Sequence, residues 1–186
     1  MNIQTKGVKA MAERDNVIHY MELRKWEVDE KLSRKRYLHR LARQSRQETE
    51  LSSKIGGMLI YNQVIEQYLT DIVSMSIFYI RAQLWPVEVA LDLDLDGATF
   101  GKMVDHFQQF ATVGANREEI LQLLKKHNIK RNAVVHDLFD IQDLQKLSQE
   151  LDAYAQMGDS LIALLDAYDD EIVQNFRRLA KEKIFA

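Results

Sequence analysis

The sequence predicts an all-helical protein organised as a bundle. Among its 186 residues one is proline and seven are glycine, while 46% are hydrophobic. Because so few residues break helices, the long stretches rich in Leu, Ala, Gln, Glu, Lys and Arg favour helices over short strands. A chain of this length can also bury one sizeable core. We therefore expect four to five core helices preceded by a long N-terminal helix.

The N-terminal helix is predicted over residues 13–50 and is mostly polar. Its apolar residues form a thin stripe without a strict heptad: Ile18, Met21, Val28, Leu32, Leu38 and Leu41. Such a helix packs on the core, pairs with another chain, or remains a solvated extension. Within it, the acid-free span 31–46 carries seven cations, namely Lys31, Arg34, Lys35, Arg36, Arg40, Arg43 and Arg46. Although the net charge is −3, local charge of this kind can attract a polyanion.

A domain boundary is predicted where this helix gives way to apolar sequence. Gly56 and Gly57 follow one another, which disfavours a continuing helix, and the apolar content rises directly after them. We divide the chain into a charged N-terminal helical extension, residues 1–52, and a helical bundle domain, residues 53–186. The first core helix is expected from Met58 to Leu84, ending before Pro86 because the residue that precedes proline is disfavoured in a helix.

The stretch LDLDLDGATF, residues 91–100, resembles the start of a calcium-binding loop. Asp92, Asp94, Asp96 and Gly97 match the first ligands and the turn glycine of an EF-hand, but Met103 occupies the position of the bidentate glutamate. A polar loop leading to a helix N-cap at Thr99 is the favoured interpretation. We predict no metal site and no cofactor.

Several further helices are predicted along the second half of the chain. A short helix is expected over residues 100–110, and Asn116 is placed to cap another over residues 117–126. Asn128 is placed to cap a third, which would begin at Ile129. One or two closing helices follow from Ile141, where apolar residues recur at helical spacing.

The stretch KRNAVVHDLF, residues 130–139, places polar residues on the apolar side of a helix. On a helical wheel Arg131 falls in the middle of the apolar arc, with Asn132 and His136 at its flank, four residues apart. Four cations, Lys125, Lys126, Lys130 and Arg131, crowd the predicted helix N-terminus, where free amides and the helix dipole favour an anion such as phosphate. Histidine exchanges protons near neutral pH. In the purely structural alternative, Arg131 pairs with an acid on a neighbouring helix, Asn132 is exposed and His136 is a core histidine.

The pattern Arg131-Asn132-x-x-x-His136 resembles the R-x4-6-H motif of the HEPN superfamily, the higher eukaryotes and prokaryotes nucleotide-binding domains. The resemblance covers about residues 53–186 and implies a HEPN-like helical bundle with the activity of a metal-independent endoribonuclease. It also implies a homodimer in which two motifs form one composite cleft. His136 would be the general acid or base, Arg131 would stabilise the pentacoordinate phosphate, and Asn132 would hold His136 or a phosphate oxygen.

The resemblance also suggests partners and a biological setting. RNA is the expected substrate, contacted through Lys125, Lys126 and Lys130 and through the basic run at Arg34, Lys35, Arg36, Arg40 and Arg43. A toxin–antitoxin or antiviral defence role would add an antitoxin or another defence protein as partner. The absence of cysteine and of any signal-peptide-like or bilayer-spanning apolar run favours a cytoplasmic location without membrane contact. Two alternatives remain: a non-catalytic HEPN-like module that binds a nucleotide, RNA or protein, and a plain bundle in which the motif is coincidental.

Overall fold

The computed structural model describes residues 30, 32–84, 87, 91, 93, 95, 97–137 and 143–183. All regular structure in these ranges is helical, which confirms the predicted all-α class. Residues 32–47 are helical and are named here the N-terminal segment. It is followed by helices α2 (Leu51–Leu84), α3 (Phe100–Phe110), α4 (Arg117–Asp137) and α5 (Leu144–Lys183).

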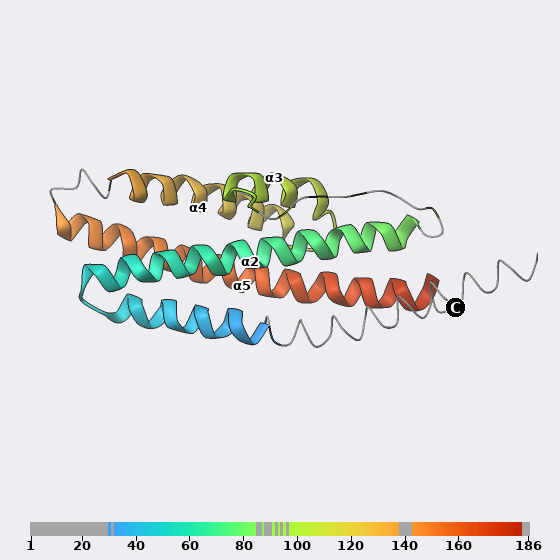
Figure 1. Ribbon diagram of the computed structural model, residues 1–186, viewed down its shortest axis with the longest axis horizontal. Helices are drawn as coiled ribbons and strands as arrows, with labels where there is room; N and C mark the ends of the chain where they lie inside the picture. The colour runs from blue at the N-terminus through green and yellow to red at the C-terminus, as the bar shows by residue number, and fades with distance from the viewer. Residues whose placement is uncertain are drawn as a thin grey trace, which may run out of the picture.

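Helices α2 and α5 form the centre of the bundle (Figure 1). Helices α3 and α4 lie on one side of this pair, and the N-terminal segment lies on the other. The two central helices run parallel and keep one register, because three polar pairs each join residues 98 positions apart: Lys54–Asp152, Tyr61–Asp159 and Tyr68–Asp166. These pairs recur every seven residues, the spacing that keeps one seam of two packed helices together.

The N-terminal segment is docked on this central pair. Ala42 is fully buried and Leu38 packs against the core. Gly57 of α2 faces the segment so closely that a Cβ on it would lie 2.0 Å from Ser45 Oγ. The chain therefore uses Gly57 for a close helix approach, and the prediction that the glycine pair interrupts the helix is wrong. Packing outweighs a propensity cost of about 1 kcal/mol per glycine. Helix α2 begins at Leu51, seven residues before the predicted Met58.

The boundaries of α3, α4 and α5 agree with the predicted capping residues at some positions and differ from them at others. Helix α3 has the predicted bounds, and the Thr99 side chain accepts a hydrogen bond from the Lys102 amide as its N-cap. Helix α4 begins at Arg117 as expected but runs without a break through Asn128. A separate helix beginning at Ile129 is therefore contradicted. Residues from Leu144 form one closing helix.

Two further expectations concern membranes and metals. None of the helices in the described ranges is both long and apolar enough to span a bilayer. The acids of the calcium-like loop, Asp92, Asp94 and Asp96, lie outside the described residues. Within the part of the chain that the structure describes, no three His, Asp or Glu residues gather as metal ligands.

Candidate functional site on helix α4

The cations of α4 lie in the middle of a continuous helix. Because α4 spans residues 117–137, the backbone amides near Lys125, Lys126, Lys130 and Arg131 are not those of a helix N-terminus. The predicted cradle of free amides at Ile129 is therefore absent, and the anion-site argument based on the helix dipole is wrong at this position. What these residues can bind depends on their side chains alone.

Arg131 is one of the two half-buried cations among these four, with Lys130. Its side chain is 32% exposed, and its guanidinium carbon lies 5.5 Å from the centre of the Phe100 ring. Its NH1 atom lies 3.9 Å from Oε1 of Glu66 on α2. This separation is an ion pair without a direct hydrogen bond, so the guanidinium keeps its N–H donors for another acceptor. The predicted pairing with an acid of a neighbouring helix therefore occurs, at long range.

A buried histidine, His127, lies against the same Phe100 ring as Arg131, and sequence reasoning missed it. His127 is fully buried one turn before Arg131, with its ring 5.5 Å from Phe100 and 4.6 Å from Tyr154. Neither of its ring nitrogens has a hydrogen-bond partner among the described residues. Burial, with a smaller contribution from the charge of Arg131, lowers the pKa of His127 to about 4. His127 is thus neutral at pH 7. Its place four residues before Arg131, on the same apolar arc, was the available signal.

Two buried polar side chains beside this site, Tyr154 and Asn62, are hydrogen-bonded to each other. The Tyr154 hydroxyl donates a hydrogen bond to Oδ1 of Asn62, which precedes Glu66 by one helical turn on α2. Both residues are buried. Burial raises the pKa of Tyr154, so the hydroxyl remains a donor. Tyr154, His127 and Phe100 therefore form a row of tilted rings in contact, and the guanidinium of Arg131 lies over the last of them, Phe100.

The two remaining motif residues point to solvent. Asn132 and His136 are both exposed, as the structural alternative predicted for Asn132, whereas His136 is not a core histidine. They share an outer face of α4 with Ile129, which is 71% exposed, and Val135, which is 41% exposed. Lys125 and Lys126 are exposed as well, and Lys130 forms an ion pair of 2.9 Å with Glu150. The structure thus separates a half-buried arginine from an exposed asparagine and histidine on one helix.

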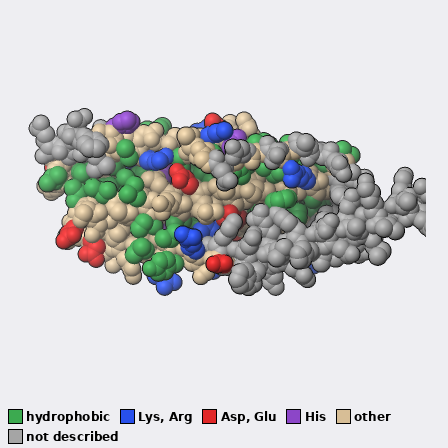
Figure 2. Space-filling view, in the orientation of Figure 1, with side chains coloured by type: hydrophobic (Ala, Val, Ile, Leu, Met, Phe, Trp, Pro, Cys, Tyr) green, Lys and Arg blue, Asp and Glu red, His purple; other side chains and the backbone are tan. Residues whose placement is uncertain are grey.

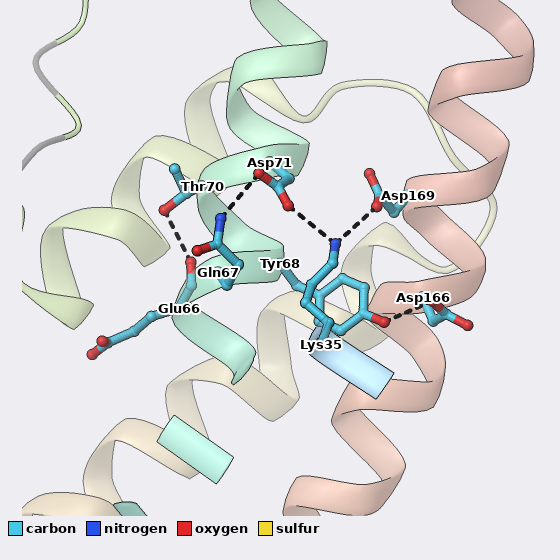
Figure 3. A network of polar contacts seen from close by, with 8 residues as sticks. All are labelled: Lys35, Glu66, Gln67, Tyr68, Thr70, Asp71, Asp166 and Asp169. Atoms are coloured by element: carbon cyan, nitrogen blue, oxygen red, sulfur yellow. Dashed lines mark hydrogen bonds and ion pairs between the residues drawn. The ribbon is translucent and has the colours of Figure 1, made fainter. Parts of the chain in front are cut away.

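The predicted basic run at the N-terminus divides into two groups. Arg34, Arg36, Arg40 and Arg43 are exposed, but Lys35 is 4% exposed. Its ammonium group lies 3.1 Å from Asp71 and 3.3 Å from Asp169 and stands 3.8 Å from the centre of the Tyr68 ring. Figure 3 shows Lys35 between the two carboxylates, with Glu66 directed away from them. Lys35 is therefore a docking residue, and its assignment as an RNA contact is wrong.

The exposed arginines do not extend the α4 site. They lie on the N-terminal segment, across the α2 and α5 pair from α4 (Figure 1). On the face seen in Figure 2, Lys and Arg side chains are scattered among acids and are not gathered in one field.

Fold and site together define an all-helical bundle protein with a candidate site on α4, formed by Arg131 over the Phe100 ring and by the exposed Asn132 and His136. The chain matches no protein-family model, no curated protein and no solved structure with which it was compared.

Proposed function

We propose that the protein is a metal-independent endoribonuclease of the HEPN type whose site contains Arg131, Asn132 and His136. The observation that carries the proposal is the placement of these side chains on α4. Arg131 is held between Phe100 and Glu66 with donors to spare, while Asn132 and His136 stay accessible just beyond it. The plain-bundle alternative makes His136 a core histidine, so the accessible imidazole is the part of this placement that favours a site.

The proposed reaction needs a base, an acid and a cation. His136 takes the proton from an RNA 2′-hydroxyl, whose oxygen attacks the adjacent phosphorus. The bond from phosphorus to the 5′-oxygen breaks, and a second imidazole protonates that oxygen. The products are a 2′,3′-cyclic phosphate and a 5′-hydroxyl end. Arg131 stabilises the added negative charge on the phosphate, and Asn132 holds His136 or a phosphate oxygen.

The second imidazole comes from a second copy of the chain in this proposal. Ile129 and Val135 are large apolar side chains exposed beside Asn132 and His136. Burying them against the same helix of another copy would remove apolar area from water and bring two His136 side chains to one cleft. The homodimer would act in the cytoplasm in a toxin–antitoxin or antiviral role, with an antitoxin as a possible partner.

One observation favours the alternative function, a non-catalytic helical module. The charge of Arg131 already faces Glu66, and the exposed apolar residues of α4 suit a protein partner as well as a second copy. In that case α4 binds a partner and no chemistry follows. The two functions share one surface and differ in whether RNA is cut.

The deciding experiment is cleavage of a mixed RNA pool by the purified protein in excess EDTA. His136→Ala and Arg131→Ala are compared with the parent, and Gln122→Ala serves as the matched control because it is exposed on the same helix. We expect the parent and the control to leave cyclic phosphate ends, and both motif variants to lose at least about 100-fold in rate while remaining folded. A folded dimeric parent that cuts nothing would favour the non-catalytic module.

A further inference from the structure

An open hollow lies between the N-terminal segment and α5, outside the α4 site. It is lined by Arg40, Arg43, Gln44, Arg46, Gln47 and Asp159. Five of the six come from the N-terminal segment, and Asp159 comes from α5. Because this segment lies across the central pair from α4 (Figure 1), the hollow is separate from Arg131 and His136.

The carboxylate at its base is rigidly held. Oδ1 of Asp159 accepts hydrogen bonds from the Tyr61 hydroxyl and from Nε2 of His39, both at 2.8 Å. Tyr61 is fully buried, and the rings of His39 and Tyr61 meet edge to face. The Asp159 carboxylate is therefore oriented by two hydrogen bonds, one from the buried Tyr61 and one from His39 of the N-terminal segment.

The arginines are oriented by Asp159 but are not satisfied by it. Arg46 NH1 lies 3.6 Å from Oδ2 and Arg43 Nε lies 3.7 Å from Oδ1, both beyond direct hydrogen-bond distance. The side chains of Arg43 and Arg46 are 66% and 38% exposed. Arg40 is exposed too and has no partner among the described residues. Three guanidinium groups therefore converge with most of their N–H donors open to a ligand.

The donor set selects a ligand of one chemistry. Three arginines face one carboxylate in the hollow, which leaves a surplus of positive charge. Guanidinium groups match the oxygens of a phosphate in pairs, and the amides of Gln44 and Gln47 add uncharged donors. A terminal phosphate carries up to two negative charges, more than an internal phosphodiester. It therefore suits a compact group of arginines, whereas an extended RNA backbone needs a longer basic surface.

We propose that this hollow is a binding site for a terminal phosphate group, held by Arg40, Arg43 and Arg46. The group belongs either to a free nucleotide or to the 5′-end of an RNA. This site does not depend on the ribonuclease proposal for α4, since no residue is shared between the two.

Calorimetric titration of the full chain at low salt tests the proposal. The probes are AMP, inorganic phosphate, and one short oligoribonucleotide with and without a 5′-phosphate. The test variant is Arg43→Gln combined with Arg46→Gln. Its matched control is Arg177→Gln combined with Arg178→Gln, which removes the same charge from exposed residues of α5. Circular dichroism of both variants checks that they remain folded.

We expect the test variant to bind AMP and the 5′-phosphorylated oligonucleotide at least about tenfold more weakly, and the control to stay within about twofold of the parent. Tighter binding of the phosphorylated oligonucleotide than of AMP supports an RNA end as the ligand; tighter binding of AMP supports a nucleotide. Three results overturn the site: no heat with any probe, equal losses in both variants, or equal binding of the oligonucleotide with and without its 5′-phosphate.

Discussion

The ammonium group of Lys35 lies 3.3 Å from Oδ2 of Asp169, across the boundary between the N-terminal segment and helix α5. The same ammonium lies 3.1 Å from Asp71 on α2, which Gln67 holds through a second hydrogen bond. Asp71 and Asp169 are again 98 positions apart. Lys35 therefore bridges a further pair of residues in the same register of the two central helices. One cation thus ties three helical segments together (Figure 3).

Removing this cation should weaken the fold. Lys35→Ala leaves the carboxylates of Asp71 and Asp169 facing each other, 17% and 18% exposed, without a counter-charge. We expect the free energy of unfolding to fall by about 2 to 3 kcal/mol in urea titrations. Arg36→Ala, at the exposed neighbouring position, should change it by no more than about 0.5 kcal/mol. Equal effects of the two substitutions would contradict the docking role of Lys35.

The pKa of Asp169 predicts one pH dependence of stability. Burial raises this pKa from 3.8 to about 6, with Lys35 opposing the rise and Asp71 adding to it. The native state therefore binds this proton more tightly than the unfolded state does. Its stabilising effect is complete below the unfolded pKa and is lost as the pH rises through 6. Relative to Asp169→Asn, the parent should gain on the order of 1 kcal/mol between about pH 7 and about pH 5. Parallel pH profiles of the two proteins would rule this out.

The pKa of His127 predicts a pH dependence of stability with the opposite sign, over nearly the same pH range. Its pKa of about 4 lies below the unfolded 6.5, so acidification protonates the unfolded chain first and lowers stability. His127→Phe removes the titrating group and with it this loss of stability. It also removes two buried ring nitrogens that have no hydrogen-bond partner among the described residues. We expect the variant to gain about 2 kcal/mol relative to the parent between about pH 7 and about pH 5. Urea unfolding across this range measures the difference, and a slope like that of the parent would mean that His127 is not buried neutral.

Two glycines inside helices should respond in opposite ways to the same substitution. A Cβ on Gly158 would lie 2.8 Å from Cδ1 of the buried Tyr61 ring, whereas a Cβ on Gly56 would meet nothing within 4 Å. Gly158→Ala should lower the free energy of unfolding by about 1 to 3 kcal/mol through overpacking. Gly56→Ala should raise it by about 0.5 to 1 kcal/mol, because alanine is the better helix former. Thermal unfolding of both variants tests the pair, and stabilisation by both would refute the close contact at Gly158.

The predictions from sequence held where a local signal decides the structure. Thr99 caps α3 because its side chain reaches an amide three residues away, and such a signal is present in the sequence itself. Asn128 carries the same type of signal, yet it lies inside α4. An N-cap residue favours a helix start only where the chain leaves the preceding helix, and packing of the α4 residues on both sides of Asn128 keeps that helix continuous. That Arg131, Asn132 and His136 form a site stays a prediction. The burial of Arg131 could not be predicted, because the helical wheel does not say which neighbour covers its side chain.

By itself the sequence determined the helical class, the bounds of α3 and the start of α4, since these follow from composition, capping and spacing within a few residues. Only the tertiary structure decided that Lys35 is buried while Arg36 is exposed, that Gly57 lies close to Ser45, and that His127 packs against Phe100. Each of these depends on a partner far along the chain. The free energy of removing a side chain from water and pairing it is set by that partner, and local propensity cannot supply it.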